Sequence, residues 1–167
     1  MTDRMTEILD AAEKRIRARG YNGFSFREIA TDVGIKSASV HHHFPTKPDL
    51  AVAVAQRYRK RIAETLLEDE KSGLSRIAAW KKLFATALHH DGLMCLCGIL
   101  AVEGDTLPAA VASEARKFFV EGAKAIETAS PGHNGFQILA QLEGALMLAR
   151  SLGDALVFDK ATANLIG

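Results

Sequence analysis

Residues 26–44, FREIATDVGIKSASVHHHF, predict two short helices joined by a tight turn. Ser25 and Glu28 have the spacing of a capping box, so we expect the first helix to begin directly after this serine. Gly34 follows the apolar face of that helix, and glycine enters the left-handed conformation of a sharp turn without a steric penalty. Residues 36–44 then form the second helix. The arrangement predicts a helix-turn-helix, whose second helix enters the major groove of DNA.

The second helix of this motif has a packing face and a polar face. Val40 and Phe44 lie four residues apart and are expected to face inward. The polar side chains are left for a ligand, and we expect DNA contacts from Ser25, Lys36, Ser37, Ser39, His41, His42, His43 and Lys47. Successive helix positions are about 100° apart, so the three histidines cannot bind one metal ion together. Contacts to bases or phosphates fit them better.

At this point the sequence resembles the TetR (tetracycline repressor) family of bacterial transcriptional regulators. The resemblance covers the first third of the chain and continues through residues 44–50, FPTKPDL, which look like the family's opening of a fourth helix. Lys36 and His41 depart from the pattern, because the family often has a small hydroxyl and a tyrosine there. The resemblance implies a homodimer that binds a palindromic operator in double-stranded DNA, usually as a repressor.

Charge is unevenly distributed along the chain of 167 residues. Residues 1–61 hold twelve Lys and Arg against seven Asp and Glu, and the remainder holds nine against thirteen. The basic end therefore contains the motif, as phosphate binding requires. Lys47 agrees with this, because a helix start disfavours a cation unless an anion such as phosphate lies nearby.

The chain contains no apolar run that approaches the length of a membrane span, and its start lacks the apolar core of a signal peptide. We therefore expect a cytoplasmic protein with reduced cysteines and no membrane partner.

Apolar spacing predicts helices throughout, without the alternating pattern of a strand. The predicted helices cover residues 3–18, 26–33, 36–44, 47–70, 74–90, 93–103, 106–129, 136–153 and 154–165. We expect an all-α fold with a three-helix DNA-binding domain over residues 1–46 and a connecting helix over 47–70. A helical bundle for ligand binding and dimerisation follows over residues 71–167.

Residues 136–153, FQILAQLEGALMLARSLG, are apolar around most of the helix circumference, so a second face needs a partner. That face lies either in the core of its own domain or against a second copy of the chain. We favour a two-fold dimer interface. Its predicted members are Phe136, Ala140, Gly144, Ala145 and Leu148.

Cys95 and Cys97 point to different sides of a predicted helix, so we expect neither a mutual disulfide nor a shared metal ion. Buried cysteines usually act as small apolar side chains. Alternatively, one thiol senses electrophiles, because residues 93–108 loosely resemble the N-ethylmaleimide-responsive repressors within the family. A small-molecule effector in an apolar pocket is the other hypothesis, and its candidate residues beside the cysteines are Trp80, Phe84, Met94, Glu103, Phe118 and Met147.

The sequence disfavours two other classes of function. An enzyme is not expected, because the chain shows no nucleophile–base pair, carboxylate cluster or phosphate loop, and no cofactor is indicated. The alternative to a regulator is a dimeric helical interaction protein with a degenerate helix-turn-helix. The turn glycine, the basic first part of the chain and Lys47 favour a DNA-binding regulator, released by an unidentified effector or by a thiol-reactive electrophile.

Overall fold

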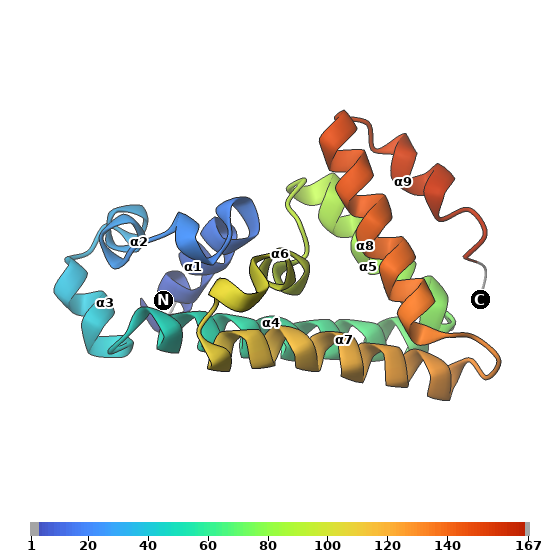
Figure 1. The fold of residues 1–167 in the computed structure, drawn as a ribbon, viewed down its shortest axis with the longest axis horizontal. Coiled ribbons are helices and arrows are strands. Elements are labelled where there is room, and N and C mark those ends of the chain that lie inside the picture. Colours follow the sequence, from blue (N-terminus) through green and yellow to red (C-terminus); the bar gives the residue numbers. More distant parts are fainter. Residues whose placement is uncertain (1–3, 166–167) are drawn as a thin grey trace. The chain divides into compact units, whose positions relative to one another are not determined.

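The computed structural model describes residues 4–165, and every regular element within them is helical. The α-helices are α1 (Arg4–Arg19), α2 (Phe26–Val33), α3 (Ser37–His43), α4 (Lys47–Lys71), α5 (Arg76–His90), α6 (Leu96–Glu103), α7 (Ala109–Ala129), α8 (Gly135–Leu152) and α9 (Leu156–Ala161) (Figure 1). Short 3₁₀ turns cover Tyr21–Gly23 and Gly104–Thr106. The predicted all-α class is confirmed, although Asp3, the predicted start of the first helix, lies outside the described residues.

No helix between residues 4 and 165 combines the length and the apolar character that a membrane span requires.

The chain forms two compact units that do not follow the order of the sequence. The first comprises the described residues up to Tyr58 together with Leu96–Arg116, so it holds α1 to α3, α6 and the first parts of α4 and α7. The second comprises Arg59–Cys95 and the described residues from Lys117 onward, with α5, α8, α9 and the remainders of α4 and α7. The predicted division at residues 46 and 70 differs from this one, because α6 joins the N-terminal helices.

The first unit has a small apolar core to which all of its helices contribute. Helices α2 and α3 pack together, and α1 packs against both α2 and α6 (Figure 1). Side chains with no exposed surface in this unit include Ile8, Ile16, Ile29, Val40, Leu50 and Leu100. The helix-turn-helix is therefore joined through α1 to the rest of the unit rather than standing alone.

A close approach between α6 and the end of α1 depends on a glycine. Glu103, at the end of α6, accepts a hydrogen bond from the backbone N–H of Tyr21 at 3.0 Å. Gly20 has a φ of 76°, and a Cβ built there would lie 1.9 Å from the Glu103 carboxylate. Any larger residue would therefore be strained at this position and would also displace the carboxylate.

The second unit is organised around α8, which packs against both α5 and α9. Its fully buried large side chains include Ile77, Ile126, Leu139, Leu142, Leu146 and Phe158. The apolar face of α8 thus supplies much of the core of this unit, as one of the two predictions for this helix requires.

The observed helix boundaries differ from the predicted ones where side chains compete for backbone groups. Helix α6 begins at Leu96 instead of residue 93, because the Asp91 carboxylate accepts the N–H of Leu93 at 2.9 Å and forms a turn. Helix α7 begins only after Pro108, whose preceding residue has extended backbone angles. Near the C-terminal end, α9 begins at Leu156 instead of residue 154, where the Asp154 carboxylate accepts the N–H of Leu156 in a similar turn, and it ends at Ala161.

Candidate nucleic-acid interface

The first helix of the motif begins and ends with the predicted chemistry. The Ser25 hydroxyl accepts the N–H of Glu28 at 3.3 Å and donates to its carboxylate at 2.9 Å. Gly34 ends α2 in the left-handed conformation, with φ 71° and ψ 36°. The next N–H, of Ile35, reaches back to the carbonyl of Ala30 at 2.9 Å. This pattern satisfies the last carbonyl groups of α2 and redirects the chain into α3.

Ion pairs fix the orientation of α2 relative to α1. The Arg15 guanidinium donates to Asp32 at 2.5 and 2.9 Å and to Glu28 at 3.0 Å. The hydrogen bond from Arg15 lowers the pKa of Asp32, and the hydrogen bond from the Ser25 hydroxyl lowers the pKa of Glu28. Both carboxylates therefore stay ionised at neutral pH, and Arg15 is used for structure within the unit.

Helix α3 packs on one side and is exposed on the other. Val40 has no exposed surface, and Phe44 is also buried. His41 is exposed but lies edge-on to the ring of Phe26, with 4.5 Å between the ring centroids. This contact orients the imidazole without covering it. The face that remains open carries polar and small side chains suited to the edges of base pairs.

All of the predicted DNA-contacting residues except Ser25 lie in α3 or close to one of its ends. Lys36, His41 and His42 are exposed, Ser37, Ser39 and His43 are half-buried, and Ser25 is exposed while it caps α2. The sequence interpretation overlooked Ala38, which is exposed and lies three and four residues before the two exposed histidines. That helical spacing could have identified it as a member of the same face.

Lys47 lies at the start of α4, where Thr46 and Asp49 form a complete capping box. The Asp49 carboxylate accepts the N–H of Thr46 at 3.0 Å, and the Thr46 hydroxyl accepts the N–H of Asp49 at 3.3 Å. The Lys47 ammonium lies 4.6 and 4.5 Å from the ring centroids of Tyr21 and Phe24. Burial lowers its pKa, and the charges of Glu103 and Glu28 oppose that shift. Aromatic faces therefore stabilise this cation without help from DNA.

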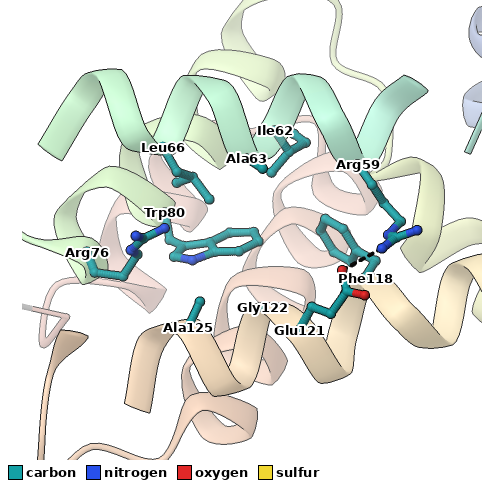
Figure 2. A pocket seen from close by; sticks show the side chains of 10 residues that line it. All are labelled: Arg59, Ile62, Ala63, Leu66, Arg76, Trp80, Phe118, Glu121, Gly122 and Ala125. Carbon is teal, nitrogen blue, oxygen red and sulfur yellow. Dashed lines mark hydrogen bonds and ion pairs between the residues drawn. The ribbon is translucent and has the colours of Figure 1, made fainter. Parts of the chain in front are cut away.

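In the second unit, two of the predicted effector residues line one cavity. Trp80 and Phe118 meet edge-to-face with ring centroids 5.6 Å apart, and both border a cavity of about 170 Å³ (Figure 2). The ring centroid of Phe84 lies 6.2 Å from that of the indole, but Phe84 does not line the cavity. The lining comes from α4, α5 and α7 and consists of Arg59, Ile62, Ala63, Leu66, Arg76, Trp80, Phe118, Glu121, Gly122 and Ala125.

The remaining candidate effector residues lie elsewhere. Glu103 belongs to the first unit and holds Tyr21, as described above. Met147 is 54% exposed on α8, and Met94 is half-buried outside the cavity lining. The sequence interpretation overlooked Arg59 and Arg76, although Arg59, Ile62 and Leu66 share a helical face that a helical projection would reveal.

Neither cysteine has the exposure that a thiol sensor needs. Cys95 is 3% exposed and Cys97 is fully buried. The Cys95 thiol neighbours the carboxyl group of Glu143, whose oxygens are buried and accept no hydrogen bond of normal geometry. Burial raises the pKa of Glu143 to about 7, and the thiol opposes this only in part. In the part of the chain that the structure describes, no three potential metal ligands come together.

A stripe of exposed positions runs along α8 at intervals of four residues. Phe136 is 55% exposed, Leu148 is 46% exposed and Leu152 is 66% exposed. Between them lie the exposed Ala140 and the half-buried Gly144, where an added Cβ would meet no atom within 4 Å. Ala145, also predicted for the interface, is 2% exposed and instead packs in the core of its own unit.

Comparisons with known proteins point to one family. Residues 8–54 match the family model of "Bacterial regulatory proteins, tetR family". The structure of a TetR transcriptional regulator from Legionella pneumophila is 32% identical, with a TM-score of 0.88 over 99% of this chain and 96% of that one. The reduced form of NemR from E. coli has a TM-score of 0.76 over 98% and 95% of the two chains, but at 19% identity it shows the fold alone.

The similarity to a curated repressor covers only part of the chain. The HTH-type transcriptional repressor AcnR of Corynebacterium diphtheriae is 31% identical over 90 residues, which are 54% of this chain and 45% of AcnR. The chain spans about half the length of the curated relatives it matches.

Proposed function

Because this chain belongs to the TetR family of transcriptional regulators, we propose that it binds duplex DNA through α3 and represses transcription in the bacterial cytoplasm. The observation that carries the proposal is the open face of α3, where Lys36, Ala38, His41 and His42 are exposed above a buried Val40. The name of AcnR, a repressor, supports the sign of regulation.

The side chains of α3 match the chemistry of the major groove. Lysine and imidazole N–H groups donate to guanine O6 and N7, and the methyl group of Ala38 fits against a thymine methyl. Phosphates would be bound by the Lys47 ammonium, because the N–H groups of Thr46 and Asp49 at the start of α4 are already taken by the capping box. The exposed Lys36 lies at the other end of this surface, directly before α3.

A homodimer would present two such helices to two half-sites, which is how helix-turn-helix proteins read symmetric operators. The α8 stripe of Phe136, Ala140, Gly144, Leu148 and Leu152 supports this, because side chains at intervals of four form a ridge that packs against its own copy. The small central residues allow two such helices to approach closely.

Release from the operator would follow from a ligand that binds one conformation of the second unit better than another. The burial of Cys95 and Cys97 favours a small molecule over direct attack of an electrophile on a thiol.

Selection from a pool of random duplexes tests the proposal. We expect enrichment of a two-fold symmetric site by the wild-type protein and no enrichment by a Lys36→Ala, His42→Ala double variant. Lys124→Ala, which removes an exposed lysine of α7 in the second unit, should enrich the same site as the wild type. A wild-type protein that enriches nothing would instead indicate an interaction protein whose helix-turn-helix only packs.

A further inference from the structure

The cavity of the second unit combines an apolar interior with hydrogen-bond donors. Ile62, Leu66 and Phe118 supply apolar walls from α4 and α7. The indole of Trp80 lies across the cavity between them, as Figure 2 shows. The polar lining consists of two arginines, the indole N–H and a single carboxylate, Glu121. A ligand that fits this lining needs an apolar body and an acceptor group.

Two of these donors are buried without an acceptor. The Nε1 atom of Trp80 and the Nε atom of Arg76 have essentially no exposed surface and donate no hydrogen bond. Trp80 as a whole is 2% exposed. A buried N–H that lacks a partner destabilises a protein by about 1–3 kcal/mol, so such groups are rare unless something binds them. Because Trp80 and Arg76 line the cavity, an acceptor group on a ligand would satisfy these N–H groups.

Both arginines lie at the boundary of the cavity and are held there by glutamates. Arg59 donates to Glu121 at 2.5 Å, and Arg76 donates to Glu70 at 2.5 Å. The side chains of Arg59 and Arg76 are only 20% and 14% exposed, whereas Glu121 is 62% exposed. Because the Glu121 carboxylate is largely hydrated already, it loses little when a ligand carboxylate replaces it on Arg59.

The size of the cavity limits the ligand. Its volume of about 170 Å³ is below the roughly 300–1,000 Å³ of sites for drug-sized molecules. One aromatic ring with a short acidic substituent is of the right order. Trp80 and Phe118, whose rings meet edge-to-face, both line the cavity and offer such a ring aromatic contacts.

We propose that this cavity binds a single-ring aromatic carboxylate, with the ring among Trp80, Phe118 and Leu66 and the carboxylate on Arg59 in place of Glu121. Arg76 lies at the opposite end of the cavity from Arg59, with Trp80 between them (Figure 2), so the further donor offered to the ligand is the indole N–H of Trp80. The inference that this ligand is the effector rests on the proposed function. The inference that the cavity binds such a ligand does not depend on DNA binding.

Calorimetric titration of the full chain tests the site directly. The probes are benzoate, phenylacetate and 3-phenylpropanoate, with benzamide and benzylamine as neutral and cationic counterparts. We expect at least one carboxylate to bind and neither counterpart to bind as well. No binding of any carboxylate up to about 10 mM, or equal binding of benzamide or benzylamine, would overturn the proposal.

Variants locate the bound carboxylate. Arg59→Gln should weaken binding by about tenfold or more, because it removes a charge-assisted hydrogen bond. Trp80→Phe keeps an apolar ring but removes the N–H, and should weaken binding roughly 2- to 10-fold. Arg61→Gln, on an exposed position of the same helix, should leave affinity unchanged. Unchanged affinity in Arg59→Gln, in a protein that melts like the wild type, would refute the assignment.

The selected operator then separates this inference from the proposed function. If the carboxylate that binds also releases the operator, it is the effector. If it binds without changing operator affinity, the site stands but its role as the effector site is wrong. Failure to select any operator contradicts the proposed function and leaves the calorimetric result intact.

Discussion

Arg15 and Lys47 are both basic residues of the first unit, yet the protein holds them in different ways. Arg15 forms ion pairs with Asp32 and Glu28, so its charge holds α1 and α2 together. Lys47 lies over two aromatic rings and keeps no carboxylate within ion-pair distance among the described residues. Their common positive charge does not reveal this difference, which only the structure shows.

Replacing Lys47 tests its phosphate contact. Lys47→Ala should weaken binding to the selected operator and to unrelated duplex alike, and should reduce the slope of log affinity against log salt by about 1 per half-site. Salt titrations by fluorescence anisotropy measure this, with Lys124→Ala as the matched control. An unchanged slope would show that Lys47 only packs on Tyr21 and Phe24.

Glu143 should make stability depend on pH. Its pKa rises from an ordinary value of 4.5 to about 7 on folding. Between these two pH values the native state keeps a proton on Glu143 that the unfolded state has lost. The contribution of Glu143 to stability is then full below pH 4.5, falls as pH rises to about 7, and is lower by about 3 kcal/mol above that.

Urea unfolding at several pH values checks this expectation. Glu143→Gln should lack the loss of stability between pH 4.5 and 7, whereas the exposed Glu68→Gln should retain it. A wild-type profile that is flat across this range would contradict the assignment.

At the scale of single elements, local sequence predicts helices well when their ends carry clear signals. The cap at Ser25 and the turn at Gly34 are found where the spacing predicted them, and α4 begins at the predicted residue 47. Predictions failed where a carboxylate captures a backbone N–H, as Asp91 and Asp154 do. Such turns offer the backbone an alternative to the first helical turn, and apolar periodicity does not reveal them.

The turn glycine gives a sharp test at this scale. Gly34→Ala should destabilise the protein by about 1–2 kcal/mol, because the left-handed backbone disfavours a Cβ, although no neighbouring atom would clash with it. Gly34→Asn should lose less stability than Gly34→Ala, since asparagine tolerates this conformation. Thermal unfolding of the two variants compares them. Equal destabilisation by both would mean that the backbone conformation is not the cause.

At the scale of the whole molecule, contacts between segments that are distant in the sequence escaped prediction. Helix α6 joins the first unit, where Glu103 meets Tyr21 over a separation of 82 residues. The cavity likewise needs α4, α5 and α7 together, so Arg59 and Arg76 could not be assigned to it from their own neighbourhoods. Periodicity shows which face of a helix is buried but not which helices meet it.

Dimerisation is the whole-molecule property that the α8 stripe should control. Leu148→Glu should convert the dimer to a monomer and weaken operator binding, because a charge would be buried in the interface. Leu67→Glu, at a similarly exposed leucine of α4, should remain dimeric. Sedimentation velocity distinguishes the two. A dimer that persists in Leu148→Glu would place the interface elsewhere.

The most direct test of the account is the affinity of the selected operator for a His41→Ala, His42→Ala double variant, measured beside the wild type by fluorescence anisotropy. If α3 reads the bases, the double variant should lose about 1–3 kcal/mol of specific binding for each base contact removed, while its binding to unrelated duplex stays the same. Specific binding that survives in a correctly folded double variant would contradict the claim that this helix is the DNA reader.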